Sequence, residues 1–145
     1  MFVFMFCFFK ILKKNKNMIK FAKKELKDDE IMRLLHEDIR KWFIDNYRSF
    51  TPPQRYAIKE IRENKNVLIS SPTGSGKTLA AFLGILNELY ELEKKGKLED
   101  KVYCLYVSPL RALNNDIKRN LLQPLEDLKQ RGLSISIRIA VRTSD

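Results

Sequence analysis

The chain has 145 residues, of which 44% are hydrophobic and 32% charged, and a formal net charge of +10. This length suits one domain with its own hydrophobic core, and the composition is ordinary for a soluble globular protein. One histidine, His36, and two cysteines, Cys7 and Cys104, exclude a histidine-based metal cluster and a disulfide framework, so we expect no disulfide partner and a reducing, cytoplasmic location.

Residues 1–27 are an apolar and basic tail, which we expect to be disordered or to precede the true start of the protein. Much of the net charge lies here, because eight lysines face a single acid, Glu25. Residues 1–12 are too few to span a bilayer, which takes about 20 apolar residues, so we predict no transmembrane segment. Three interpretations stay open: a membrane-surface anchor, a sticky tail, or upstream sequence translated before a start at Met18, which we favour.

Residues 28–145 have the pattern of a folded domain that begins with a helix. Acidic residues at 28–30 suit a helix N-terminus, and apolar residues then recur at spacings of three and four. These residues are Ile31, Leu34, Leu35, Ile39, Trp42 and Phe43. The spacing predicts one continuous helix whose apolar face packs on a neighbouring surface, with His36 on its exposed side.

Helices and short apolar runs alternate through the rest of the chain. Pro52 and Pro53 fit the first turn of a short helix that runs to Ile61. The pattern then predicts a strand at 66–70, a helix at 77–93, a charged loop at 94–101, a strand at 102–107, a helix at 111–130 that Pro124 divides and Gly132 closes, and a strand at 133–141. This order predicts an α/β fold, a parallel sheet flanked by helices.

A candidate phosphate-binding loop follows the first predicted strand and opens the next helix. It consists of Ser71, Pro72, Thr73, Gly74, Ser75, Gly76, Lys77 and Thr78. Glycines let the backbone curl so that N–H groups converge on phosphate oxygens, and the helix N-terminus adds partial positive charge. Lys77 would reach the β- and γ-phosphates of ATP and the Thr78 hydroxyl would bind Mg²⁺, so these two are the predicted catalytic residues. A chance glycine-containing turn is the alternative.

Three motifs in order resemble those of one helicase family. They are Phe50–Gln54, the phosphate loop Ser71–Thr78, and Ser108–Asp116. In order and spacing they resemble the Q motif, motif I and motif Ia of superfamily-two DEAD/DEAH-box helicases, and their wording is most similar to the large-helicase-related branch. The resemblance implies the N-terminal part of the first motor domain, a partial RecA-like domain over residues 28–145 that ends before the Walker B strand.

The resemblance also implies roles for residues outside the phosphate loop. Gln54 would contact the adenine edge, which an amide can do with a donor and an acceptor together. The competing interpretation is a capping box, in which Thr51 is the N-cap and Gln54 closes the first turn. Pro109, Leu110 and Arg111 match motif Ia and would contact the backbone of a single nucleic-acid strand, independently of sequence. An ordinary turn with a solvated arginine is the alternative there.

Several parts of a complete motor are not found in these residues. No Asp-Glu-x-His or Asp-Glu-x-Asp string occurs, and Ser144 replaces a glycine that the family has before Asp145. We therefore expect the chain alone to bind ATP and to hydrolyse it negligibly. A stand-alone nucleotide-binding interaction module and a gene remnant remain the alternative functions, and the choice of DNA or RNA stays open.

Overall fold

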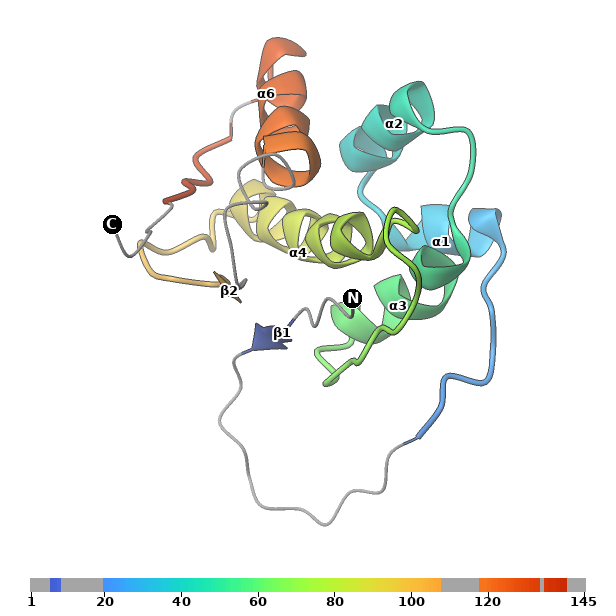
Figure 1. Cartoon of the computed structure of the whole chain (residues 1–145). Helices are drawn as coiled ribbons and strands as arrows, with labels where there is room; N and C mark the ends of the chain where they lie inside the picture. The colour runs from blue at the N-terminus through green and yellow to red at the C-terminus, as the bar shows by residue number, and fades with distance from the viewer. Residues whose placement is uncertain (1–5, 9–19, 108–117, 134, 141–145) are drawn as a thin grey trace.

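The computed structural model describes residues 6–8, 20–107, 118–133 and 135–140 (Figure 1). Within these residues the chain is mainly helical. The elements in order are β1 (Phe6–Phe8), α1 (Asp28–Leu34), α2 (Glu37–Asn46), α3 (Pro52–Arg62), α4 (Lys77–Lys94), β2 (Leu105–Val107), a π-helical turn η1 (Lys118–Leu122) and α6 (Gln123–Gln130). The predicted helices at 52–61 and 77–93 are confirmed, each to within one residue.

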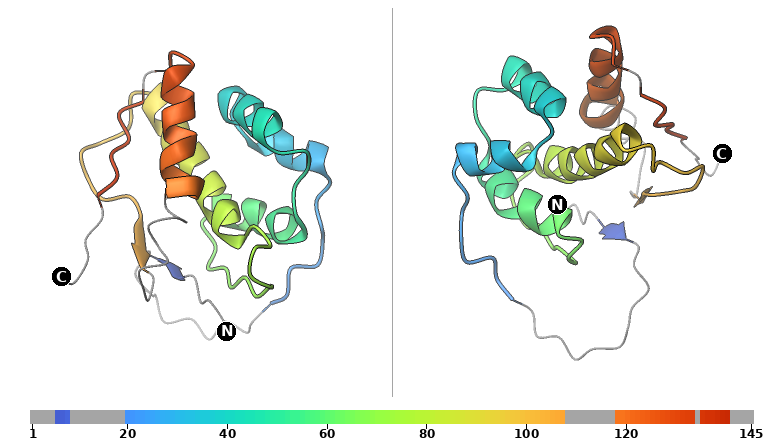
Figure 2. Two further views of the ribbon diagram at one scale, coloured as in Figure 1. Left: turned by 45° about the horizontal axis from the view of Figure 1, so that its top comes forward. Right: turned by 180° about the vertical axis from the view of Figure 1, so that it is seen from behind.

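Helices α3 and α4 form the centre of the molecule, and the other helices pack around them (Figures 1 and 2). Gly84 on α4 lets the two approach closely, because a Cβ there would lie 3.0 Å from Ile61 Cγ2 on α3. Ala57 and Ile58 of α3 are buried against this surface. The buried residues of α4 are Leu79, Ala80, Ala81, Phe82, Leu83, Gly84, Leu86, Asn87 and Tyr90. This long apolar helix is therefore the core element, and its first residue belongs to the phosphate loop.

The single helix predicted from Asp28 to Phe43 is wrong, because the chain breaks between α1 and α2. Leu35 and His36 are extended, with ψ angles of 143° and 147°. His36 caps α2, since its Nδ1 accepts a hydrogen bond from the Asp38 N–H at 3.3 Å. The apolar positions still share one buried face, because the two short helices bend around the same core. The predicted apolar face thus packs within this domain, and His36 is half-buried rather than fully exposed.

A buried amide on α4 holds the break between α1 and α2 in place. Asn87 is fully buried, and its Oδ1 accepts the His36 N–H at 2.6 Å. Its Nδ2 donates to Glu91 Oε1 at 2.7 Å, and the same carboxylate oxygen accepts from Arg62 on α3 at 2.7 Å. A buried polar group that is fully paired specifies one arrangement of its neighbours. Asn87 therefore joins the α1–α2 junction, α4 and α3 through one network.

The one strand pairing among the described residues differs from the predicted parallel sheet. β1 and β2 pair antiparallel, with Cys7 opposite Tyr106. β2 confirms part of the strand predicted at 102–107, but the described parts of 66–70 and 133–141 are extended without strand pairing. A strand is defined by the hydrogen bonds of a neighbour, and these segments have no ladder partner within the part of the chain described.

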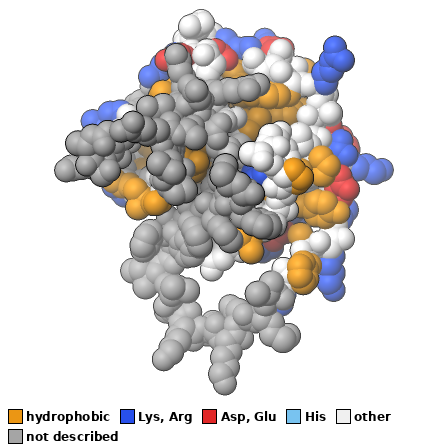
Figure 3. All heavy atoms as spheres, viewed as in Figure 1, with side chains coloured by type: hydrophobic (Ala, Val, Ile, Leu, Met, Phe, Trp, Pro, Cys, Tyr) orange, Lys and Arg blue, Asp and Glu red, His pale blue; other side chains and the backbone are white. Residues whose placement is uncertain are grey.

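The two extended segments nevertheless have the side-chain alternation of strands. Val67 and Ile69 pack against the core, whereas Leu68 between them is 72% exposed. In the second segment Ile135 is buried and Ile137 and Ile139 are partly buried, while the intervening residues are exposed. One face of each segment therefore lies on the helices. Apolar side chains elsewhere remain at the surface, as Figure 3 shows, and Phe21, Val102 and Val107 are among the exposed ones.

The last helical region was predicted to kink or divide at Pro124, but its described part runs without interruption from Lys118 to Gln130 and changes only from a π-helical turn to an α-helix just before the proline. In the described part of residues 111–130, η1 precedes α6, and Pro124 lies in the first turn of α6. Gly132, which has a φ of +80°, follows the C-terminus of α6, and the Gly132 N–H donates to the Lys129 carbonyl at 2.9 Å.

Among the described residues, no helix combines the length and apolar character needed to cross a bilayer.

Candidate functional site

The segment Ser71–Thr78 forms a tight loop between an extended segment and the N-terminus of α4. Gly74 and Gly76 both have positive φ angles, +78° and +85°, which side-chain-bearing residues rarely adopt. The loop is drawn together by the hydroxyls of Ser71 and Ser75, whose oxygens lie 2.6 Å apart. The Ser75 N–H also donates to the Pro72 carbonyl at 3.4 Å. The glycines expected from the sequence thus lie where the backbone turns.

Lys77 holds the two sides of the loop together. Its ammonium donates to the main-chain carbonyls of Ser71 at 2.5 Å and Pro72 at 2.6 Å. The side chain therefore folds back over the loop instead of extending into solvent, and it is half-buried. A single positive charge in this position is available to an anion that enters the loop, because an ammonium group carries three donors. The role of Lys77 at nucleotide phosphates stays a prediction.

The N-terminus of α4 faces the same loop. Gly76 is the N-cap residue and its carbonyl accepts the Ala80 N–H at 3.0 Å, which starts the helical ladder. The N–H groups of the first turn have no partner inside a helix, and together with the helix dipole they attract anions. Thr78, the second residue of α4, is half-buried beside them. The loop and α4 thus combine backbone donors, a helix N-terminus and a lysine.

Gln54 connects helix α3 to this loop. Its side chain is only 3% exposed, and its Oε1 accepts the Thr51 N–H at 2.9 Å, as the capping-box interpretation predicted. Its Nε2 donates to the Gly76 carbonyl at 3.4 Å. The Thr51 hydroxyl itself is buried without a hydrogen-bond partner, so only the glutamine half of the box is formed. One amide therefore caps α3 and contacts the phosphate loop.

The donor set fits a nucleotide phosphate with its metal ion. Pro72, Thr73 and Gly74 are exposed, and a Cβ built on Gly74 would meet nothing within 4 Å, so the mouth of the loop is open. Backbone N–H groups, Lys77 and the Thr78 hydroxyl supply the chemistry that ATP phosphates and Mg²⁺ require. The residues present are thus compatible with ATP, and the loop–helix arrangement offers a place for its phosphates.

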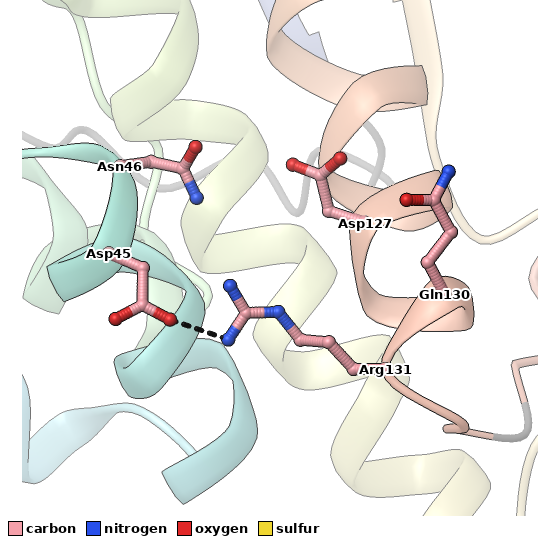
Figure 4. A pocket seen from close by; sticks show the side chains of 5 residues that line it. All are labelled: Asp45, Asn46, Asp127, Gln130 and Arg131. Carbon is pink, nitrogen blue, oxygen red and sulfur yellow. Dashed lines mark hydrogen bonds and ion pairs between the residues drawn. The ribbon is translucent and has the colours of Figure 1, made fainter.

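A second feature lies apart from this loop, between α2 and α6. It is a polar hollow of about 360 Å³ lined by Asp45, Asn46, Asp127, Gln130 and Arg131 (Figure 4). Asp45 on α2 and Arg131 after α6 form an ion pair across it at 2.7 Å. No residue of the phosphate loop lines this hollow. The hollow is therefore a separate feature of the α2–α6 boundary.

The residues of motif Ia are not placed. Pro109, Leu110 and Arg111 lie outside the described residues, as do residues 141–145, so their predicted contact with nucleic acid stays a prediction. Two features were not predicted from the sequence, the Gln54–Gly76 contact at the loop and the Asn87 network farther along α4. Contacts between residues 22 and 51 positions apart have no periodicity signal. The sequence feature that indicates the Asn87 network is a polar asparagine within the apolar stretch of α4.

Comparison with known proteins identifies relatives for most of the chain. Residues 51–143 match the family model described as DEAD/DEAH box helicase. The chain is 58% identical over 132 residues to the ATP-dependent helicase Lhr-Core of Methanocaldococcus jannaschii, which covers 88% of this chain and 16% of that protein. It is 60% identical over 119 residues to Lhr-Core of Saccharolobus solfataricus, covering 81% of this chain and 14% of the relative.

A bacterial relative is more distant. The Lhr helicase/uracil glycosylase of Escherichia coli is 34% identical over 115 residues, which are 73% of this chain and 8% of that protein. No solved structure matches the chain. The chain thus spans about one sixth or less of the length of these relatives.

Proposed function

Because this chain belongs to the DEAD/DEAH box helicase family, as its motifs predicted, we propose that it binds ATP and Mg²⁺ through the loop Ser71–Thr78 as part of an ATP-dependent helicase. Membership of the family implies a RecA-like α/β fold, and the similarity to Lhr-Core helicases agrees with the predicted branch. The observation that carries the proposal is the tight loop at the N-terminus of α4, in which the Lys77 ammonium donates to the carbonyls of Ser71 and Pro72.

Each residue of the loop has a role in the proposed site. The backbone from Ser71 to Gly76 curls around the phosphates, and Gly74 keeps the entrance free of side chains. Lys77 neutralises phosphate charge, and the Thr78 hydroxyl is a ligand of Mg²⁺. Mg²⁺ held there would offset the negative charge of the phosphates. Gln54 supports the loop through Gly76 and contacts the adenine edge with its remaining hydrogen-bonding capacity.

We also propose that the chain contributes strands to a parallel β-sheet and binds single-stranded nucleic acid. The alternating burial of residues 66–70 and 135–140 supports one-sided strands on the helical layer, which in the complete RecA-like domain pair in parallel with the strand at β2. Pro109, Leu110 and Arg111 bind the backbone of a single strand, and the binding weakens with salt. The sequence contains no Asp-Glu-x-His or Asp-Glu-x-Asp string, so the chain alone binds ATP with negligible hydrolysis.

A fluorescent ATP analogue carrying a methylanthraniloyl group tests the nucleotide site. We expect saturable, Mg²⁺-dependent binding that ADP displaces far better than AMP, because the loop recognises the β-phosphate. Lys77→Ala should weaken binding by at least about tenfold, which corresponds to 1.4 kcal/mol. Lys41→Ala is the matched control, since Lys41 is exposed on α2. Equal affinity of the Lys77→Ala and Lys41→Ala proteins would show that the loop is not the phosphate site.

A further inference from the structure

Helix α1, which lies upstream of the family match, packs beside α3 (Figure 1). Its first residue, Asp28, contacts both flanks of the α3 cap. Asp28 Oδ2 accepts the Phe50 N–H at 3.2 Å, although the two residues are 22 positions apart. Arg55 Nη2 lies 2.9 Å from Asp28 Oδ1, an ion pair without a hydrogen bond between these two atoms. One carboxylate therefore holds the residue before Thr51 and the residue after Gln54.

Further contacts from the upstream segment fix Phe50 and Arg55. The Arg55 guanidinium pairs with Glu25 at 3.3 Å, and the Arg55 main-chain carbonyl accepts the Leu26 N–H at 3.3 Å. The Phe50 ring is 2% exposed and stacks on Phe43 of α2, with the ring centroids 4.0 Å apart. Both flanks of the cap are thus bound to residues that precede position 51, where the family match begins.

The other acids at the start of α1 have partners close by in the sequence. Asp29 pairs with Arg33 one turn later at 3.3 Å, and both side chains are exposed. Glu30 accepts the Lys27 N–H at 2.8 Å and so closes the first turn of α1. All three acids suit a helix N-terminus, so helix formation alone does not explain why Asp28 reaches α3. Its carboxylate is half-buried, and a backbone N–H bound to a charged acceptor makes a stronger hydrogen bond than a neutral pair.

Gln54 connects the residues that Asp28 holds to the phosphate loop. Its buried amide accepts the Thr51 N–H at 2.9 Å and donates to the Gly76 carbonyl at 3.4 Å. Thr51 and Gln54 lie between Phe50 and Arg55, so a shift of this turn changes the distance from Gln54 to Gly76. Hydrogen bonds of this kind usually span about 2.7–3.2 Å, so a small outward shift of the turn would break the contact.

We propose that Asp28 is a positioning residue of the nucleotide site, which holds the first turn of α3 so that Gln54 keeps its contact with the phosphate loop. The inference rests on the proposed function, because it requires that ATP binds at the loop Ser71–Thr78. It gives the segment upstream of the helicase-family match a part in setting nucleotide affinity.

Binding of the methylanthraniloyl ATP analogue tests the positioning role. Asp28→Ala removes a negative charge, so charge alone would strengthen binding of an anionic nucleotide. The positioning role instead predicts an affinity lower by about fivefold, the lower end of the usual coupling between sites. Asp29→Ala is the matched control, because it makes the same charge change at the neighbouring exposed position, and its affinity should stay within about twofold of wild type. Equal affinities of the two variants would overturn the proposal.

A double-variant cycle separates positioning from a general loss of structure. In the Gln54→Ala protein the connecting amide is gone, so adding Asp28→Ala should change the affinity by less than about twofold. If the two losses multiply instead, Asp28 does not act through Gln54 and the proposal is wrong. Should Asp28→Ala fail to fold, Asp28→Asn takes its place with Asp29→Asn as the control, since an asparagine keeps an acceptor oxygen for the Phe50 N–H but loses the ion pair.

The Lys77→Ala protein distinguishes failure of the positioning role from failure of the proposed function. Binding that Lys77→Ala weakens and Asp28→Ala leaves intact would contradict the positioning role and leave the phosphate site standing. A wild-type protein that binds no ATP analogue would contradict the proposed function and the positioning role with it. Thermal melts of each variant set a temperature of measurement at which all of them are folded.

Discussion

The side-chain amide of Gln54 donates to the main-chain carbonyl of Gly76 across 3.4 Å, and this contact joins the N-terminus of α3 to the phosphate loop. The same amide accepts the Thr51 N–H with its oxygen, so cap and loop depend on one side chain. Any change at position 54 should therefore affect both the stability of α3 and the shape of the nucleotide site.

Two substitutions of Gln54 separate its two contacts. Gln54→Glu keeps an acceptor for the Thr51 N–H but loses the donor to Gly76 and any donor to adenine. We expect ATP affinity to fall severalfold while helix content, measured by circular dichroism, stays close to wild type. Gln54→Ala removes both contacts and should also cost about 1 kcal/mol of stability, the usual value of a lost cap. Unchanged ATP affinity in both proteins, with helicity lost in the alanine variant, would leave Gln54 with the cap alone.

Gly76 tests how tightly the loop is packed against α3. Alanine at this position would place its Cβ 2.7 Å from Gln54 Nε2 and 3.0 Å from Thr51 Oγ1. Gly96 is the control, because it too has a positive φ but a Cβ there would meet nothing within 4 Å. Both alanine variants lose about 1–2 kcal/mol to the left-handed backbone. Gly76→Ala should lose about 1 kcal/mol more through the displaced hydrogen bond, as measured by urea unfolding. Equal losses would show that Gln54 moves aside without cost.

Asn87 should be the most sensitive polar position of the core. Asn87→Ala leaves the His36 N–H without its acceptor and removes one of the donors to Glu91, at a position that is fully buried. We expect a loss of about 1–3 kcal/mol in the free energy of unfolding. Asn66→Ala, at an exposed position, should change it by less than about 0.5 kcal/mol. A loss at Asn87 no larger than at Asn66 would mean that the α1–α2 junction does not depend on the amide.

The phenol of Tyr90 should make the folded protein less stable at alkaline pH. Burial is the main cause that raises its pKa, and the hydrogen bond to Asp38 at 2.7 Å adds to the effect. In the unfolded chain the phenol ionises near about pH 10. Because the folded-state pKa is raised, the contribution of Tyr90 to stability is complete below that pH and declines as the pH rises above it.

Urea unfolding between pH 8 and 11.5 measures the slope of the free energy of unfolding against pH. Tyr90→Phe should be less stable than wild type at pH 8 and should show a shallower decline above pH 10. Tyr56→Phe is the control, since Tyr56 is 38% exposed, and its slope should match wild type. If the stability of the Tyr90→Phe protein declined with pH as steeply as that of wild type, Tyr90 would not be the cause of the decline.

Local sequence determined the helices and the phosphate loop. Apolar spacing located α3 and α4, because a helix that buries one side needs apolar residues at intervals of three and four. The loop was predictable because positive-φ glycines, Lys77 and the start of α4 are all consecutive residues. For the same reason the sequence anticipated the cap between Thr51 and Gln54, three residues apart.

Only the tertiary structure decided the features that join distant residues. The helix predicted at 28–43 is broken because Asn87, 51 residues after His36, accepts the His36 N–H. The strand segments at 66–70 and 135–140 carry the alternation of strands, but pairing depends on neighbours, and the described ladder is the antiparallel one between β1 and β2. The Gln54–Gly76 contact and the Asp45–Arg131 ion pair likewise join residues that are far apart in the sequence. A hydrogen bond between distant residues leaves no periodicity in the sequence, whereas local propensity and spacing do.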